Sequence, residues 1–331
     1  MNEVQTGDFH LQLLDRRQKL ESARAMRPDV SEVTRLLREV DAALERIETR
    51  TYGLCAVCHD PIEPDRLAAD PLLTFCLDHL SAEQKRALQE DLDLASRIQS
   101  TLLPERHLRA AGWEACYHYE PAGPVSGDFC DLLRSGAGLF FLTGDVSGKG
   151  VASSLLMSQL HAIFRTLLSL QLPVRQLVER ANRLFCASSP PSSYATLVCG
   201  ECSPAGDVEL CIAGHCPPLL LRDQARPIDP TGLPLGLFCE ARYDTLRLHM
   251  DAGDTLVLYT DGLTEARNRA GEEYGAERLS RTLTPCRHSP PGDMVGKVLA
   301  ELAAFLAGSG KTDDLTVFIL QRLPAAVRGS A

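Results

Sequence analysis

The fold is decided by the stretch from Leu139 to Gly150, which reads LFFLTGDVSGKG. Its first half has the apolar composition and the length of a buried strand. Asp145 follows this run directly, and Gly148 and Gly150 then favour a tight loop. A single aspartate beside glycine is usually a turn residue. The stretch therefore indicates a functional site only if the same arrangement recurs elsewhere in the chain.

Strand-length apolar runs do recur after about Gly112, separated by Gly, Pro, Ser and Asp. We predict strands over Leu139–Thr143, Ala195–Cys199, Val208–Ala213, Pro218–Leu221, Leu246–His249, Thr255–Tyr259 and Thr316–Leu320. Helical spacing of apolar residues predicts helices over Ala152–Leu170, Pro173–Ala187 and Pro291–Leu306. Many strands with a few long helices predict an α+β domain, which we assign to residues 105–323, followed by a flexible tail at 324–331.

Three more aspartates share the position of Asp145 at the end of an apolar run: Asp128, Asp261 and Asp313, the last followed by Asp314. A strand end holds a carboxylate beside the core, and carboxylates gathered there repel one another unless cations neutralise them. Oxygen-only ligands suit magnesium or manganese, and two such ions can promote phosphoryl hydrolysis. The recurrence predicts a carboxylate site for two of these cations.

These segments resemble the PPM-type metal-dependent serine/threonine phosphatases, in particular the SpoIIE/RsbU branch. The resemblance runs from about Leu94 to Leu320. Its motifs are Ile98-Gln99 with Leu102-Leu103-Pro104, Tyr119-x-Pro121-Ala122, Gly127-Asp128-Phe129-Cys130-Asp131, Gly144-Asp145-Val146-Ser147-Gly148-Lys149-Gly150, Ala213-Gly214-His215, Leu233-Pro234-Leu235-Gly236, Tyr259-Thr260-Asp261-Gly262-Leu263-Thr264-Glu265 and Thr312-Asp313-Asp314-Leu315-Thr316-Val317.

This resemblance implies two packed β-sheets flanked by helices, with two manganese or magnesium ions between the sheets at one edge. It implies that Asp145 bridges both ions and that the backbone carbonyl of Val146 faces the second ion. Asp261 and Asp313 would complete the shell of the first ion, and Asp128 would serve the second, directly or through water. A hydroxide held between the ions would attack phosphorus in line, so these four aspartates are the predicted catalytic residues.

The implied substrate is phosphoserine or phosphothreonine on a signalling protein, such as an anti-sigma-factor antagonist. Three positions depart from the wider family. Ser126 replaces a common glycine, Cys130 stands where tyrosine is common, and Ser147 occupies the position at which eukaryotic relatives have histidine. None of these departures removes a predicted metal ligand.

A separate block over residues 52–80 contains two metal-binding pairs, Cys55-x-x-Cys58 and Cys76-x-x-His79, with 17 residues between them. This spacing is what one tetrahedral zinc requires. Four protein ligands leave no open position, so the zinc is predicted to be structural. His59 is a competing candidate for one ligand.

The block resembles the DksA/TraR zinc-finger family through Tyr52-Gly53-x-Cys55-x-x-Cys58, Ile62, Arg66-Leu67, Ala69, Pro71 and Cys76-x-x-His79. That family usually has cysteine as its fourth ligand, where this chain has His79. Some members act on RNA polymerase through a long acidic-tipped coiled coil, whereas the helices here are short. The alternative function is thus an RNA-polymerase-interacting or zinc- or redox-sensing regulator with secondary phosphatase activity.

Two helical segments flank the block. Residues 1–51 are predicted to contain short helices, one capped by Asp29, that either form a hairpin or coiled coil or cover their own domain. Residues 81–104 are predicted to form a linker helix capped by Ser81, with an apolar face that includes Ile98 and Leu102. This linker is either a spacer or a switch that sets catalytic activity. The N-terminal helices and the linker helix are also candidates for forming a homodimer.

The composition limits the class of protein. The chain has 331 residues, 44% of them hydrophobic, and a net charge of −10, which disfavours binding to nucleic acid. No stretch is expected to reach the roughly 18 apolar residues of a membrane span. We therefore predict a cytoplasmic protein without a membrane segment. Its 12 cysteines are expected to be thiols or zinc ligands, with Cys199 and Cys211 as buried structural thiols.

Overall fold

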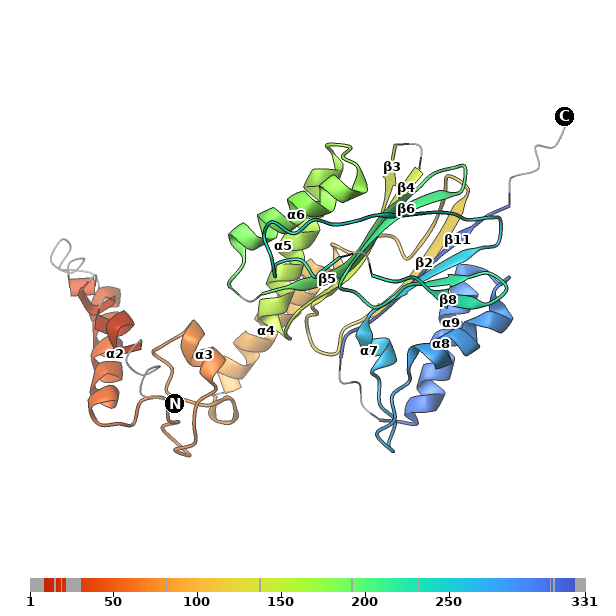
Figure 1. Cartoon of the computed structure of the whole chain (residues 1–331). Coiled ribbons are helices and arrows are strands. Elements are labelled where there is room, and N and C mark those ends of the chain that lie inside the picture. The colour runs from red at the N-terminus through yellow and green to blue at the C-terminus, as the bar shows by residue number, and fades with distance from the viewer. Residues whose placement is uncertain are drawn as a thin grey trace. The chain divides into compact units, whose positions relative to one another are not determined.

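The computed structural model describes residues 9–14, 16–18, 20–21, 31–80, 82–136, 138–191, 193–230, 232–309, 311 and 313–324. The chain forms two compact units, Met1–Asp91 and Leu92–Ala331 (Figure 1). The predicted helix caps Asp29 and Ser81 and the tail after residue 324 lie outside the described residues.

The first unit is helical around its zinc block. Residues 9–14, 16–18 and 20–21 are helical and precede α2 (Ser31–Glu48), α3 (Pro64–Ala69) and the 3₁₀ helix η1 (Leu77–His79). The apolar stripe of α2 lies in one buried cluster with the zinc block, formed by Leu13, Val40, Ala43, Leu44, Tyr52, Cys55, Ile62, Leu67 and Cys76. The stripe therefore covers its own unit, which is one of the alternatives that the sequence left open.

Hydrogen bonds add to the apolar packing of the zinc block. The Arg46 guanidinium of α2 donates to the Leu73 carbonyl over 3.0 Å, and the Tyr52 hydroxyl donates to the Pro71 carbonyl over 2.9 Å. The Glu63 carboxylate accepts from the backbone N–H of Leu77 over 3.1 Å, at the start of η1. These bonds hold the segment between the two ligand pairs against α2.

The second unit contains two antiparallel sheets (Figure 1). One sheet has the order β1-β2-β11-β10-β7-β8 and the other β3-β4-β5-β6-β9. The strands are β1 (His107–Ala110), β2 (Trp113–Glu120), β3 (Asp128–Ser135), β4 (Gly138–Val146), β5 (Ala195–Cys202), β6 (Asp207–Ala213), β7 (Leu219–Leu221), β8 (Ala225–Pro227), β9 (Leu246–His249), β10 (Thr255–Tyr259) and β11 (Leu315–Arg322).

Helices cover the outer face of each sheet. The pair α5 (Val151–Leu168) and α6 (Val174–Ser188) packs on the β3–β9 sheet, and α8 (Ala276–Leu283) and α9 (Pro291–Leu306) pack on the other. A third apolar cluster fills the space between the sheets. The short α7 (Asp261–Thr264), η2 (Thr284–Cys286) and the linker helix α4 (Ala82–Ser100) complete the element list. The predicted α+β fold of two sheets flanked by helices is confirmed.

All seven predicted strands and all three helices of this unit are present, but several further elements were not predicted. Among them are β2 and β3, and β3 carries Asp128. The expectation that no segment resembles a membrane span was wrong, since α5 is long and apolar enough to meet that test. Its buried residues, such as Phe164, pack in the core beneath the β3–β9 sheet, which accounts for its apolar composition.

Candidate active site and metal centres

Asp128 begins β3 and Asp145 is the next-to-last residue of β4, and the two lie directly opposite each other in the register of these strands. Asp128 is buried, and its Oδ2 accepts hydrogen bonds from Thr260 Oγ1 over 2.8 Å and Thr316 Oγ1 over 2.6 Å. Both threonines belong to the β10–β11 side of the other sheet. The carboxylate thus joins the two sheets at one edge.

Asp261 and Asp313 lie beside each other at the same edge. Asp261 begins α7, and the next residue, Gly262, touches the backbone before β11. A Cβ on Gly262 would lie 1.8 Å from the Asp314 carbonyl oxygen and 3.3 Å from the Asp313 Cβ. Only glycine permits this approach, which explains the Asp-Gly pair at this position.

The electrostatics of these carboxylates show strong mutual repulsion. Burial first, and then the neighbouring carboxylates of Asp261, Asp313 and Asp314, raise the pKa of Asp145 to about 7. Burial and then Asp313 raise the pKa of Asp261. Lys149 Nζ lies 2.8 Å from Asp313 Oδ2 and offsets part of this charge. A group of ionised oxygen ligands with excess negative charge fits divalent magnesium or manganese.

Asp313 and Asp314 differ in what their carboxylates contact. Asp314 Oδ1 accepts from the Ala122 N–H over 2.7 Å, and its Oδ2 accepts from the Gly127 N–H over 2.9 Å. Both oxygens therefore fix the loop that leads into Asp128. Asp313 instead contacts Lys149, and its metal ligation stays a prediction.

The Val146 carbonyl oxygen lies beside Asp145 and Gly127. The Val146 N–H donates to the Gly127 carbonyl over 3.2 Å. A Cβ on Gly127 would lie 2.9 Å from the Val146 carbonyl oxygen and 3.1 Å from Asp145 Oδ1. Gly127 thus leaves space for both oxygen atoms. Metal ligation by Val146 and by the four aspartates stays a prediction.

Sequence reasoning assigned no role to Gln99, yet its side chain holds the loop before Asp128. Gln99 lies near the end of α4 and is 5% exposed. Its Nε2 donates to the Ser126 carbonyl over 2.7 Å, and its Oε1 accepts from the Ser126 N–H over 3.0 Å. Ser126 Oγ then accepts from the Asp128 N–H over 3.0 Å. The only sequence signal was the Ile98-Gln99 motif of the resemblance.

His215 lies beside β5, the strand paired with β4, where the sequence indicated only a turn. It is buried, and burial lowers its pKa to about 4. Its Nδ1 lies 2.8 Å from Thr196 Oγ1, and Thr196 is the register partner of Asp145 on β5. The imidazole is therefore a neutral, structural neighbour of the strand that carries Asp145.

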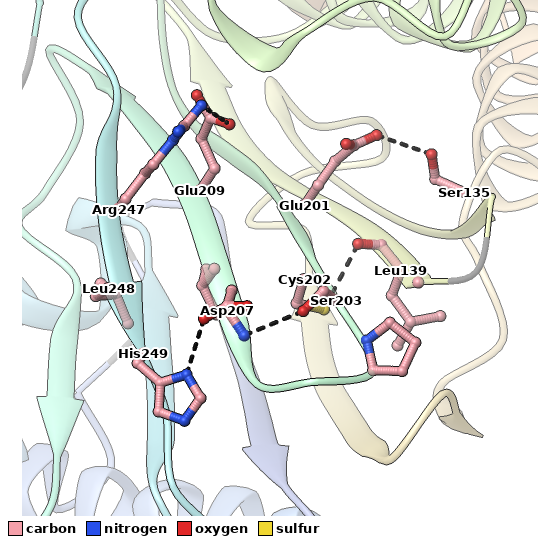
Figure 2. A pocket seen from close by; sticks show the side chains of 13 residues that line it. Ser135, Leu139, Glu201, Cys202, Ser203, Asp207, Glu209, Arg247, Leu248 and His249 are labelled. Carbon is pink, nitrogen blue, oxygen red and sulfur yellow. Dashed lines mark hydrogen bonds and ion pairs between the residues drawn. The ribbon is translucent and has the colours of Figure 1, made fainter.

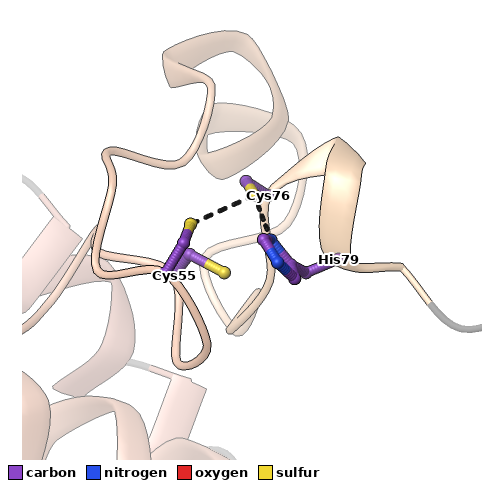
Figure 3. A group of neighbouring side chains, drawn as sticks. Cys55, Cys76 and His79 are labelled. Carbon is purple, nitrogen blue, oxygen red and sulfur yellow. Dashed lines mark hydrogen bonds between the residues drawn. The ribbon is translucent and has the colours of Figure 1, made fainter.

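The predicted zinc ligands converge in the first unit. One ligand atom each from Cys55, Cys58, Cys76 and His79 lies within 4.8 Å of the other three (Figure 3). Cys58 Sγ lies 3.8 Å from Cys76 Sγ, and Cys76 Sγ lies 3.2 Å from His79 Nδ1. In the described part of the chain, this is the one group of three or more such side chains that meets this distance.

The thiols of this cluster influence one another. Burial opposes ionisation of Cys55, but backbone N–H groups, including that of Cys58, outweigh it and lower the pKa to about 6. At Cys58, a backbone contact from Asp60 favours ionisation, yet burial and the two neighbouring thiols raise the pKa to about 12. One thiolate forms easily and further ones need a cation. This donor set fits zinc.

A separate cleft lies in the second unit, and its lining residues include none of the four candidate aspartates. It has a volume of about 660 Å³ and is lined by Ser135, Glu201, Asp207, Glu209, Arg247 and His249 among others (Figure 2). Ser135 ends β3, whereas Asp128 begins it. The charged side chains of the cleft pair with one another, as Arg247 does with Glu209 and His249 with Asp207. We therefore assign the active site to the carboxylates and not to this cleft.

Comparisons with known proteins give two family matches. Residues 135–323 match the family model described as stage II sporulation protein E (SpoIIE). Residues 50–78 match the prokaryotic DksA/TraR C4-type zinc finger, and this match ends directly before His79. The second match covers the three cysteines of the cluster but not its histidine.

Individual relatives agree with the first match. The chain is 26% identical over 263 residues to protein IcfG of Synechocystis, covering 70% of this chain and 41% of IcfG. It is 23% identical over 242 residues to the phosphoserine phosphatase RsbU of Bacillus subtilis, covering 72% of each. The SiaA-PP2C domain of Pseudomonas aeruginosa has a similar fold, with a TM-score of 0.63 and 18% identity over 73% of this chain and 99% of that domain.

Proposed function

The chain belongs to the SpoIIE family of PPM-type phosphatases, and from this premise we propose that it hydrolyses phosphoserine or phosphothreonine on a signalling protein such as an anti-sigma-factor antagonist. The observation that carries the proposal is the gathering of carboxylates at one edge: Asp128 lies opposite Asp145 in the register of β3 and β4, and Asp261 and Asp313 lie close enough to repel the charge of Asp145. A folded chain keeps such repulsion where function requires it.

The carboxylates of Asp128, Asp145, Asp261 and Asp313 would hold two manganese or magnesium ions. When bound, such ions lower the pKa of a water molecule and offset the charge that develops on the phosphoryl group. The chain's own residues position these ligands. Thr260 and Thr316 orient Asp128, and Lys149 lies beside Asp313 with an exposed ammonium that can attract the substrate phosphate.

We propose that Cys55, Cys58, Cys76 and His79 bind one structural zinc ion. The cluster supplies the four N and S ligands of a closed tetrahedral site. A cytoplasmic location follows from this proposal, because three thiol ligands must stay reduced to bind zinc.

Two features of the linker helix α4 support a regulatory role: an exposed apolar face and the side chain of Gln99. Leu88, Leu92, Ala95 and Ile98 share one face of the helix, and Leu88 and Ile98 are 42% and 56% exposed. This face suits pairing with the same helix of a second copy. Gln99 points to the loop before Asp128 instead, so a change in the position of the helix would reach a predicted metal ligand.

The test is hydrolysis by the full-length protein, with manganese, of serine-, threonine- and tyrosine-phosphorylated protein mixtures. The proposal expects release of phosphate from serine and threonine sites, dependent on manganese or magnesium. Identification of sites that disappear with wild type but persist with Asp145→Asn would name the substrate. Activity confined to phosphotyrosine, or equal activity without divalent metal, would contradict the proposal.

A further inference from the structure

Two thiols outside both metal centres lie together on the second unit. Cys186 is half-buried in the last turn of α6. Cys239 is exposed and lies in the loop that follows the Leu233-Pro234-Leu235-Gly236 motif. The proposed catalytic and zinc-binding functions use neither residue.

The backbone around Cys239 is fixed against α6. Asn182, one turn before Cys186, donates through Nδ2 to the Phe238 carbonyl over 2.8 Å and to the Cys239 carbonyl over 3.1 Å. Its Oδ1 accepts from the Gly236 N–H over 2.9 Å, and the Cys186 thiol contacts the Gly236 carbonyl over 3.6 Å. The loop therefore holds Cys239 at the helix turn that carries Cys186.

The two thiols are neighbours, since Cys186 Sγ lies 3.6 Å from the Gly236 carbonyl and Asn182, one turn earlier on the same helix, binds the Cys239 carbonyl. Burial, and then the neighbouring Cys239 thiol, raise the pKa of Cys186 to about 11. An oxidant therefore reaches the exposed Cys239 first, while Cys186 is the neighbour available to react with the product.

We propose that Cys186 and Cys239 are an oxidation site that forms an intramolecular disulfide when the protein meets a hydroperoxide. The Cys239 thiolate attacks a peroxide oxygen, so that an S–O bond forms, the O–O bond breaks and hydroxide leaves to become water. The Cys186 sulfur then attacks this sulfenic acid, so that the S–S bond forms and a second water leaves. The two thiols lose two electrons and hydrogen peroxide gains them.

The chain contains its own comparison pair. Cys199 and Cys211 are opposite each other in the register of β5 and β6, so they are also neighbours. Both are fully buried in the cluster beneath α5 and α6, where an oxidant in water does not reach them. Both pairs therefore consist of neighbouring cysteines, but only Cys186 and Cys239 include a thiol that solvent reaches.

The proposed disulfide would restrict a segment next to the candidate active site. The Leu235 N–H and carbonyl exchange hydrogen bonds of 2.8 and 2.9 Å with Ala195, the first residue of β5. Ala195 is the register partner of Val146. A bond between α6 and the loop would thus limit movement of the chain beside the strand end that carries Asp145 and Val146.

The experiment is peroxide treatment of the full-length, zinc-loaded protein, followed by alkylation of the remaining thiols and peptide mapping without reduction. We expect one crosslinked peptide joining Cys186 to Cys239, which dithiothreitol reverses. Cys239→Ser should abolish this peptide. Cys286→Ser, at another half-buried thiol, should leave it unchanged. Zinc release, followed with a chromogenic chelator, reports separately on Cys55, Cys58 and Cys76.

Three results would overturn the proposal: complete alkylation of both thiols after peroxide, sulfinic acid at Cys239 with Cys186 still alkylated, or linkage of Cys199 to Cys211 at the same rate. None of these readouts depends on phosphatase activity. Failure of this proposal is therefore distinguishable from failure of the proposed catalytic function.

Discussion

The zinc cluster and the carboxylate site differ in how the chain brings their ligands together. The four candidate zinc ligands come from the short segment between Cys55 and His79, which packs in one small cluster with α2. The carboxylates come from both sheets, between Asp128 and Asp313, and lie on an extensive core. The first site is expected to need its metal to fold, whereas the second is folded first and carries repulsion that its metals relieve.

The largest effect should come from the predicted bridging ligand. Asp145→Asn removes one of the negative charges that hold both ions, and we expect the rate of phosphoprotein hydrolysis to fall at least about a hundredfold. The hydrolysis rates of Asp261→Asn and Asp313→Asn should fall by a similar factor. Steady-state turnover at saturating manganese measures this effect, and wild-type turnover by Asp145→Asn would contradict the two-metal assignment.

Asp314 provides the matched control for Asp313. Asp314→Asn should weaken the hydrogen bonds to Ala122 and Gly127 and destabilise the fold by about 1–3 kcal/mol. Its effect on turnover at a temperature where it is folded should be much smaller than that of Asp313→Asn. Equal losses in the two variants would mean that the division of roles between these neighbours is wrong.

Loss of a zinc ligand should affect the first unit alone. We expect Cys55→Ser to remove the bound zinc, about one ion per chain in wild type, and to unfold residues 52–79. The unfolding transition of the second unit should be unchanged, because its core is separate. Elemental analysis and proteolysis measure these outcomes. Zinc-free wild-type protein, purified without chelator, would reject the zinc assignment.

The pH dependence of stability should distinguish the two sites. In the folded protein the pKa of Asp145 is about 7, above its ordinary value of 3.8. Its protonated form is therefore favoured by folding, and this stabilisation is complete below about pH 4 and lost as pH rises through 7. Without manganese, the second unit should lose up to about 4 kcal/mol of unfolding free energy over this range.

The same substitution that removes activity should therefore stabilise the manganese-free protein. Asp145→Asn lacks the ionisable group, so its unfolding free energy should change less between pH 5 and pH 8 than that of wild type. Urea denaturation in manganese-free buffer at both pH values gives this comparison. Equal changes of unfolding free energy with pH in the two proteins would show that ionisation of Asp145 does not cause the loss of stability.

The smallest effect should come from the linker helix. Gln99→Leu removes both hydrogen bonds to Ser126, and we expect kcat to fall about tenfold, the equivalent of roughly one hydrogen bond. Ile98→Gln changes an exposed neighbour and should leave the isolated chain's turnover unchanged while weakening any helix pairing. Sedimentation measured beside turnover separates the two roles. Identical kinetics for Gln99→Leu and wild type would make the linker a spacer.

The sequence alone indicated the zinc cluster more directly than the carboxylate site, for a physical reason. The zinc ligands are close in the chain, so their spacing alone indicated one tetrahedral cluster. The aspartates were identified because they recur at the ends of apolar runs and lie in motifs that resemble a known family. Their separation along the chain does not show which strand ends meet. Thr260 and Thr316 were missed as partners of Asp128 for the same reason, since the packing of the two sheets brings them together.

Physical reasons also explain why some elements were not predicted from the sequence. The strand β3 has the sequence DFCDLLRS, whose charged residues break the alternation typical of a strand. Asp131 within it is nevertheless buried, because Arg165 and His161 of α5 pair with its carboxylate. Similarly, nothing in the spacing of Cys186 and Cys239 indicates that Asn182 holds their segments together.

The most direct test of two independent metal centres is a metal count on the wild-type protein and two variants. Full-length wild type, dialysed with excess manganese, should hold about one zinc and about two manganese ions per chain. Asp145→Asn should keep the zinc and lose manganese, and Cys55→Ser should do the reverse. Manganese bound equally by wild type and Asp145→Asn, or lost together with zinc in Cys55→Ser, would contradict the existence of two independent metal centres with different ligand chemistry.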